Sequence, residues 1–326
     1  MSRQPIRIGA RGSKLSLAQS GHMQVRIAHA LGAPLDAGPE EIATYAQLIP
    51  IVTSGDRIQN RRLMEIGGKG LFTKEIEEAL LDGRIDCAVH SLKDMPAVLP
   101  PGLVLAATPE REDVRDAFIS HKAQRLEDLP RGARLGTASL RRQAQALHVR
   151  PDLDIVMLRG NVDTRLAKLE RGEADAILLA QSGLNRLGLG HIPQSWLDPV
   201  AAPPAPGQGA LAIESRAEDA GLPWLQAIAC RATTLAVAAE RGALYALEGS
   251  CRTAVGAHAR LEGARLHLIV EALSPDGVIR IRHEGEITLA GPDDAGDDEG
   301  QARALGLELG AVVKAEGGDA IIAPSE

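Results

Sequence analysis

The chain has 326 residues, of which 44% are hydrophobic, and this length exceeds one ordinary core and predicts two or three domains. The net charge of −7 argues against a nucleic-acid-binding protein, and no segment approaches the roughly 18 unbroken apolar residues of a membrane-spanning helix. The start of the chain lacks the apolar stretch of a secretory signal, and the three cysteines, Cys87, Cys230 and Cys251, form no CxxC pair. We therefore expect a cytosolic protein without a disulfide framework or a zinc site.

The first part of the chain alternates short apolar runs with helical patterns. We expect strands at 6–8, 48–52, 85–89 and 103–107, helices at 14–31 and 73–82, and a loop at 34–41. This alternation indicates an α/β fold with a largely parallel sheet.

A faint repeat suggests that a second, similar half follows. The run from Leu81 through Gly83 to Asp86 resembles the run from Glu170 through Gly172 to Asp175. In each, a helix ends, a glycine stands where a left-handed cap is expected, and an aspartate opens a buried strand. The second half begins near Glu110 and ends in the Pro/Gly-rich segment 203–209, which fits a hinge.

The last part of the chain has a different pattern. A strand at 210–214 precedes a long Ala/Leu-rich helix at 233–247. Strands are then expected at 255–261, 266–273 and 278–287, with a closing helix at 299–314. The turn signals between these strands predict hairpins, and hence a small α+β domain with an antiparallel sheet.

Two groups of arginines fall where an expected strand ends and a helix begins. Arg141 and Arg142 open one helix; Arg159 precedes the next, which Asn161 caps, and Arg165 lies one turn inside it. Ligands of open α/β sheets bind at such edges, and the free N–H groups of a helix start favour anions. Because guanidinium pairs bidentately with carboxylate, the group predicts a carboxylate site, although a single arginine is more typical of a surface ion pair.

Asp94 follows a buried strand and is expected at the same kind of edge. Beside arginines and Lys93 its carboxylate would stay ionised, and it could stabilise positive charge on a nitrogen heterocycle. A turn-capping role is the alternative. Arg11 and Ser13, after the first strand, add a cation and a hydroxyl at this edge, whereas His90 is more typical of a packed core residue.

Two further motifs contain residues capable of chemistry. The glycine-rich segment 67–70 is not a phosphate loop, because Gly70 stands where Ser or Thr is required, and it fits a mobile flap better. Cys251 lies in a turn beside Arg252, where a thiol is prone to ionise, while Cys87 and Cys230 read as core residues.

Together these segments resemble the porphobilinogen deaminase (hydroxymethylbilane synthase) family over nearly the whole chain. The resemblance is carried by residues 11–19, 67–75, 88–96, 110–118, 136–143, 158–161 and 205–210. Motifs of this length, in this order, are highly specific.

The resemblance implies a fold of three domains. The first two would be similar to periplasmic binding proteins, with mixed, mostly parallel sheets, and the third would be a small α+β domain with an antiparallel sheet. The implied bounds are 1–108 plus 207–228 for the domain with the catalytic aspartate and flap, 109–206 for the arginine-rich cleft, and 229–326 for the cofactor-attachment cysteine.

It also implies a dipyrromethane cofactor, attached through a thioether to Cys251, and it identifies Asp94 as the catalytic residue. Lys69 and Phe72 match the flap, and no metal is implied. The residues that match carboxylate-binding and supporting positions are Arg11, Ser13, Ser91, Lys93, Thr137, Ser139, Arg141, Arg142, Arg159, Arg165 and Arg186. The chain departs from the family in one loop. The family loop is Gly-Gly-Cys-Gln-Val-Pro, whereas residues 249–254 are Gly-Ser-Cys-Arg-Thr-Ala, so the cysteine is retained and the glutamine after it is not.

The implied activity is that of a transferase of tetrapyrrole biosynthesis. It would join four porphobilinogen molecules into hydroxymethylbilane and release ammonia, as a cytoplasmic monomer that binds a small-molecule substrate and neither nucleic acid nor membrane. The first alternative is a non-catalytic solute-binding protein for a polycarboxylate. The second is a Schiff-base enzyme that uses Lys69 or Lys93.

Overall fold

A computed structural model describes residues 4–53, 73–247, 254–291, 296–317 and 321. The chain divides into two compact units, Met1–Glu112 with Ala210–Thr234, and Asp113–Gly209 with Leu235–Glu326. Among the described residues, no helix has the length and apolar character needed to cross a membrane.

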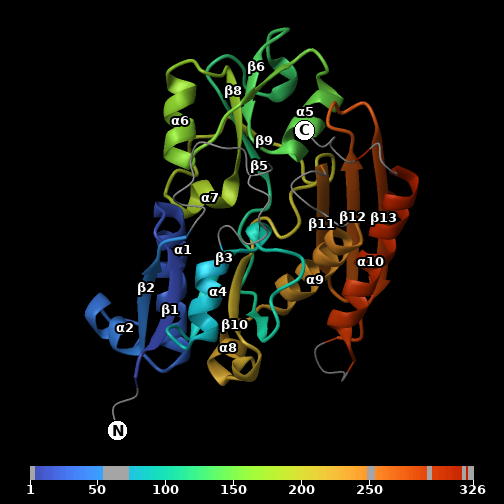
Figure 1. Ribbon diagram of the computed structural model, residues 1–326. Coiled ribbons are helices and arrows are strands. Elements are labelled where there is room, and N and C mark those ends of the chain that lie inside the picture. The colour runs from blue at the N-terminus through green and yellow to red at the C-terminus, as the bar shows by residue number, and fades with distance from the viewer. Residues whose placement is uncertain (1–3, 54–72, 248–253, 292–295, 318–320, 322–326) are drawn as a thin grey trace. The chain divides into compact units, whose positions relative to one another are not determined.

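The first unit contains a five-stranded mixed sheet in the order β2-β1-β3-β10-β4 (Figure 1). Its elements are β1 (Ile6–Arg11), α1 (Lys14–Ala30), α2 (Pro39–Tyr45), β2 (Ala46–Ile51), α4 (Lys74–Leu81), β3 (Cys87–Ser91), the 3-10 turn η1 (Leu92–Asp94), β4 (Leu103–Ala107), β10 (Leu211–Arg216), η3 (Ala217–Asp219) and α8 (Pro223–Ile228). Strand β1 is parallel to β2 and β3, and β10 is antiparallel to both of its neighbours. Side chains of β3 alternate between faces: Val89 joins the core with Met23 of α1, and Ala88 packs with Ile76 of α4.

Segment 34–41 differs from the predicted loop, because α2 begins at Pro39. Proline is tolerated in the first helical turn, where its missing N–H has no intrahelical acceptor. Glu40 and Glu41 then complement the positive helix start, and Ile42 is buried against the core. The prediction missed this helix because it is short and begins with turn-forming residues.

A second five-stranded sheet lies in the other unit, in the order β7-β6-β8-β5-β9. Its elements are β5 (Asp116–Ser120), η2 (Leu126–Asp128), β6 (Arg134–Thr137), α5 (Leu140–Val149), β7 (Asp154–Met157), α6 (Val162–Glu170), β8 (Ala176–Ala180), α7 (Gln181–Arg186) and β9 (Ser195–Trp196). Here β6 is parallel to β7 and β8, and β5 is antiparallel to β8 and β9. The two sheets therefore share the same pattern of strand directions, with the antiparallel strand in the fourth place, although that strand (β10) comes last along the chain in the first sheet and its counterpart (β5) comes first in the second.

The repeat predicted from the sequence is present in detail. Gly83 and Gly172 both adopt positive φ, at 68° and 71°. Asp86 accepts the backbone N–H of Arg7 at 2.7 Å, and Asp175 accepts that of Arg134 at 2.8 Å. In each half the aspartate thus joins the start of its own strand to the neighbouring parallel strand.

Helix α9 (Arg231–Ala246) begins in the first unit and continues into the second, because the boundary falls after Thr234. The C-terminal part of the second unit also contains the antiparallel strands β11 (Ala254–Glu262), β12 (Arg265–Leu273) and β13 (Arg280–Thr288), and α10 (Asp298–Gly317). Helix α10 packs on β12 and β13 (Figure 1). The hydrophobic core formed by these helices and strands contains Ala239 and Ala243 of α9, Leu268 and Val270 of β12, and Leu309 of α10. The predicted α/β class, with mixed and mostly parallel sheets followed by an antiparallel sheet, is confirmed.

Candidate functional site

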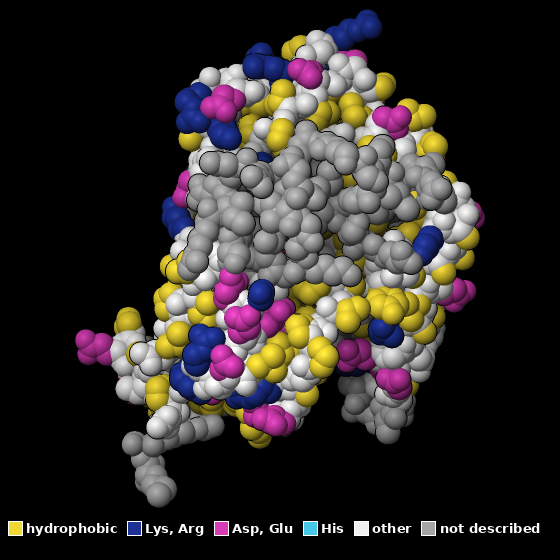
Figure 2. Space-filling model, viewed as in Figure 1, with side chains coloured by type: hydrophobic (Ala, Val, Ile, Leu, Met, Phe, Trp, Pro, Cys, Tyr) yellow, Lys and Arg dark blue, Asp and Glu magenta, His cyan; other side chains and the backbone are white. Residues whose placement is uncertain are grey.

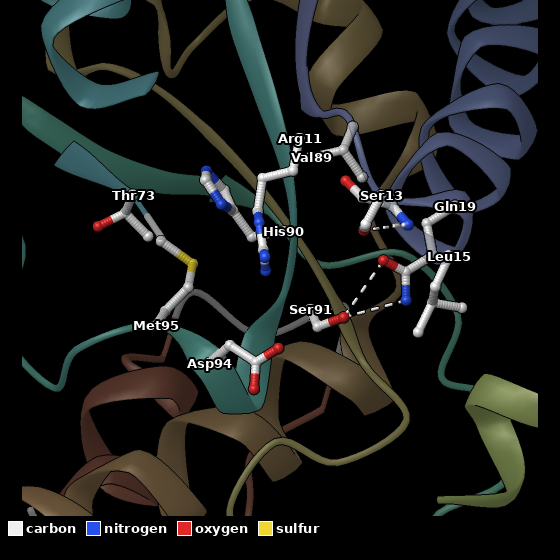
Figure 3. A pocket seen from close by; sticks show the side chains of 11 residues that line it. Arg11, Ser13, Leu15, Gln19, Thr73, Val89, His90, Ser91, Asp94 and Met95 are labelled. Carbon is white, nitrogen blue, oxygen red and sulfur yellow. Dashed lines mark hydrogen bonds between the residues drawn. The ribbon is translucent and has the colours of Figure 1, made fainter. Parts of the chain in front are cut away.

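A pocket in the first unit lies where the parallel strands β1 and β3 end. Its lining residues are Arg11, Ser13, Leu15, Ser16, Gln19, Thr73, Val89, His90, Ser91, Asp94 and Met95 (Figure 3). Since β1 and β3 are parallel, Arg11 and Ser91 come to the same edge of the sheet. This is the edge at which open α/β sheets bind ligands.

The polar groups of the pocket are held in place by local contacts. Ser13 caps α1 and accepts the N–H of Ser16 at 3.3 Å. Gln19, from the buried face of α1, exchanges two hydrogen bonds with Ser91, at 3.0 and 3.2 Å. Asp94 ends the 3-10 turn after β3 and is exposed, with its carboxylate on the pocket side (Figure 3). Arg11, Ser13, Ser91 and Asp94 are therefore brought together as predicted.

The second unit has an equivalent edge at the ends of β6 and β7. Thr137 accepts the N–H of Ser139 at 3.1 Å, and Ser139 caps α5 by accepting the N–H of Arg142 at 3.4 Å. Asn161 caps α6 in the same way, at 2.8 Å from the N of Thr164. The predicted strand-to-helix positions are thus observed, and the first turns of α5 and α6 present N–H groups at this edge.

Arg141 and Arg142 are buried, and both pair with Asp116 at the start of β5. Arg142 Nη2 lies 2.7 Å from Asp116 Oδ1, and Arg141 Nη1 lies 2.8 Å from Asp116 Oδ2. Gln208 donates to Asp116 at 2.9 Å. Burial raises the pKa of Asp116, but the two guanidinium groups outweigh it and hold that pKa far below its usual range, while burial lowers the pKa of Arg141.

The remaining arginines of the predicted set have partly exposed side chains. Arg165 Nε donates to the carbonyl of Gly160 at 2.8 Å, and Arg186 Nη2 donates to the carbonyl of Gly209 at 2.6 Å. Arg159 is half-buried before α6, and its carbonyl accepts from Lys168 at 3.2 Å. These three belong to the second unit, and Lys93, also half-buried, to the first.

Much of the basic excess between 134 and 171 is neutralised within the second unit. Arg134 pairs with Asp175, Arg150 with Asp152, and Arg171 with Glu173. On the face shown in Figure 2, the described basic and acidic side chains are interspersed. The charge run in the sequence therefore has largely structural partners.

Three predicted residues, Lys69, Phe72 and Cys251, lie outside the described residues. Of the other cysteines, Cys87 is buried in β3, and this burial raises the pKa of its thiol. Cys230 precedes α9, and its backbone N–H donates to the carbonyl of Thr108. Because Cys230 is only half-buried, the prediction that it is a core residue is wrong.

Sequence reasoning missed three polar residues of these sites, namely Gln19, Glu214 and Asp116. Gln19 lies on the core-facing side of α1, with Met23 and Ile27 one and two turns further on. Glu214 and Asp116 lie within buried strands. A polar side chain at a core-facing position is the signal that could have found all three, because such groups need a partner.

Two family models match the chain. The model described as "porphobilinogen deaminase, dipyromethane cofactor binding domain" matches residues 6–223, and "porphobilinogen deaminase, C-terminal domain" matches residues 234–315. The chain belongs to the porphobilinogen deaminase family. Curated family members include one from Caulobacter vibrioides strain NA1000, 81% identical over 99% of this chain and 100% of its own length. Another, from Phenylobacterium zucineum, is 69% identical over 99% and 100% of the two chains.

Solved structures of a periplasmic substrate-binding protein and of a lipoprotein also align with the chain. A periplasmic substrate-binding protein of an ABC transporter from Coxiella burnetii aligns at 15% identity and a TM-score of 0.39, over 68% of this chain and 89% of its own. A YaeC-family lipoprotein from Enterococcus faecalis aligns at 13% identity and a TM-score of 0.38, over 71% and 94%.

Proposed function

We propose that the protein is a hydroxymethylbilane synthase that joins four porphobilinogen molecules and releases ammonia. The observation that carries this proposal is the full-length match to porphobilinogen deaminases, together with an exposed Asp94 in a pocket that also holds Arg11 and Ser13. A non-catalytic solute-binding protein is not favoured, since the C-terminal part of the chain matches the family's own C-terminal domain. The proposal includes action as a monomer in the cytoplasm.

Asp94 is proposed as the catalytic residue. Loss of ammonia from porphobilinogen leaves a methylene carbon whose positive charge is shared with the pyrrole ring. An ionised carboxylate that accepts the pyrrole N–H stabilises that charge where it develops. The exposed position of Asp94 at the pocket gives it access to a bound ring.

The arginines are proposed to bind the acetate and propionate arms of the substrate. Arg11 does so in the pocket of the first unit, with Ser13, Ser91 and Lys93 as supporting groups. In the second unit this role belongs to Arg159, Arg165 and Arg186, with Thr137 and Ser139 in support. Arg141 and Arg142 are proposed to bind a carboxylate arm only through the N–H groups that do not face Asp116, because each guanidinium group already forms an ion pair with that residue.

The residues present also fit a dipyrromethane cofactor. Such a group carries several carboxylates and pyrrole N–H groups, and the described sites offer guanidinium donors and the Asp94 carboxylate as acceptor. Cys251 is proposed as its point of attachment, with Lys69 and Phe72 in a flap. When bound, the cofactor supplies the first free pyrrole carbon on which substrate units are joined.

An intact mass spectrum of the purified protein tests this proposal. We expect a mass above that of the bare chain by one dipyrromethane, and a Cys251→Ala variant with the bare mass and no turnover. Cys230→Ala is the matched control and should keep both adduct and activity. An adduct that survives Cys251→Ala, or that disappears with Cys230→Ala, would show that the attachment site is wrong.

A further inference from the structure

His90 and Glu214 form a buried pair directly behind the Asp94 pocket. His90 Nε2 lies 3.0 Å from Glu214 Oε2, and the two side chains are 5% and 0% exposed. Strands β3 and β10 are antiparallel neighbours, which places both residues on one face of the sheet. His90 is also one of the residues that line the pocket (Figure 3). Its ring therefore has one nitrogen in contact with a carboxylate, and the residue borders the space open to a ligand.

A second carboxyl group lies close to this pair. Glu77 of α4 is buried, and its pKa is raised by burial and by the charge of Glu214, against a lowering effect of Thr73 and His90. Glu214, at 3.0 Å from Nε2, is the carboxyl group in direct contact with the imidazole.

A histidine bonded to a carboxylate in this way is suited to receive a proton. The carboxylate selects the ring tautomer and stabilises the imidazolium that forms. Carbon–carbon bond formation in the proposed reaction releases one proton, and none of the residues discussed so far has been assigned to accept it. When the methylene carbon bonds to the free α-carbon of a pyrrole, the C–H bond at that α-carbon must break, and its electron pair returns to the ring.

We propose that His90 accepts this α-proton and that Glu214 is its positioning residue. The inference rests on the proposed function. Ammonia departs with the protons of the substrate ammonium group, so charge balances: the proton released in carbon–carbon bond formation resides on the imidazole and then passes to water. Asp94 meanwhile keeps its charge for the pyrrole cation, so stabilising the cation and taking the proton fall to different groups of one pocket.

The first test compares porphobilinogen with and without deuterium at its free α-carbon. We expect His90→Gln to lower kcat by about 10²-fold or more, the usual contribution of a general base, and to show a larger deuterium isotope effect on kcat than wild type. Glutamine can still donate to Glu214, which preserves the buried contact. His121→Gln is the matched control, because His121 forms an exposed pair with Glu170 at 2.9 Å.

The second test does not depend on turnover. In Glu214→Gln, the imidazole stays and its carboxylate partner at 3.0 Å is lost, so the ring tautomer and the Nε2 chemical shift of His90, followed by ¹⁵N NMR, should change. Among the described residues, Arg11 of β1 and Asp94 of η1 are the other charged groups that line the pocket, and Glu77 of α4 interacts electrostatically with the buried pair; the substitution alters none of the three. This variant decides the matter if His90→Gln does not fold.

The outcomes separate this inference from the proposed function. Wild-type protein that forms no tetrapyrrole overturns both. An active wild type with a His90→Gln variant that matches His121→Gln, or that is slow without an isotope effect, overturns only the role of His90. An unchanged ¹⁵N spectrum of the His90 ring in Glu214→Gln overturns the pairing with Glu214.

Discussion

Asp94 and Asp116 illustrate how position decides the use of one residue type. Asp94 is exposed at the end of a 3-10 turn beside a pocket. Asp116 is 2% exposed and ion-paired to two guanidinium groups. Asp94 is therefore available to a ligand, whereas Asp116 allows two positively charged guanidinium groups to lie side by side within the fold.

We expect Asp94→Asn to keep the pyrrole adduct but to lower kcat by roughly 10²–10³, the usual loss when one preorganised electrostatic partner is removed. The side chain keeps its shape and loses its charge. Steady-state kinetics and an intact mass of the same sample measure both effects. Asp128→Asn, on the exposed 3-10 turn of the second unit, is the control, and a near-normal kcat in Asp94→Asn would remove Asp94 from the chemistry.

Asp116→Asn should lower the free energy of unfolding by about 3–5 kcal/mol, because it leaves Arg141 and Arg142 buried without their counter-charge. Urea unfolding at pH 7 measures the loss. Glu173→Gln, which breaks an exposed pair with Arg171, should leave the midpoint nearly unchanged. Equal midpoints for Asp116→Asn and wild type would show that the buried cluster contributes little.

Asp116 also predicts a pH dependence of stability. Its pKa in the folded state is depressed, so its contribution is complete above the ordinary aspartate range, near pH 4, and is lost as the pH falls below it. Wild type should therefore lose stability more steeply than Asp116→Asn between about pH 4 and pH 2. Parallel curves for the two proteins would contradict this assignment.

Among the elements, helices α9 and α10 approach unusually closely. A Cβ placed on Gly306 would lie 1.9 Å from the carbonyl of Ala239, and one on Gly242 would lie 2.4 Å from the carbonyl of Arg303. The backbones of the two helices are thus in contact, and glycine is required there by space and not by its dihedral angles.

Gly306→Ala should consequently destabilise the protein, by about 1–3 kcal/mol as for other overpacked sites. Gly21→Ala in α1 is the matched control, because a Cβ there meets no atom within 4 Å. This control should be stabilising by roughly 0.5–1 kcal/mol, since alanine has the better helix propensity. Thermal unfolding compares the two, and the same sign for both would refute the close contact.

On the scale of the whole molecule, a buried polar network joins the two sheets of the second unit. Gln145 of α5 donates to Glu271 of β12 at 2.9 Å and to the carbonyl of Pro203 at 2.9 Å. Arg280 of β13 donates to the other oxygen of Glu271 through Nε at 2.6 Å. Glu271 is fully buried, so this network ties the C-terminal sheet to the α/β sheet beside it.

We expect Glu271→Gln to accelerate amide hydrogen exchange in both β6 and β12, and to leave β1 and β3 of the first unit unchanged. The reason is that the substitution weakens the buried contact shared by the two sheets of one unit. Glu284→Gln, at an exposed pair with Arg282, should change none of these strands. Faster exchange confined to β12 would show that the sheets are not coupled through Glu271.

The sequence by itself determined the α/β alternation, the repeat, the antiparallel C-terminal sheet, the family and the strand-end positions of Asp94, Arg141 and Arg159. These follow from local rules: residue periodicity, capping by Ser139 and Asn161, and turn glycines. The antiparallel strand in each mixed sheet, the helix at Pro39 and the partial exposure of Cys230 did not follow, because pairing direction and burial depend on distant segments.

Only the tertiary structure decided which charges pair with which. In the sequence, Arg141 and Arg142 lie at the same kind of strand-to-helix junction as Arg159 and Arg165. Only the structure shows that Arg141 and Arg142 pair with Asp116, which lies 25 and 26 positions earlier. In the same way His90, a core residue by pattern, meets Glu214 across two strands. Electrostatic partners depend on distance and burial in space, and residues far apart along the chain acquire both only when the sheets assemble.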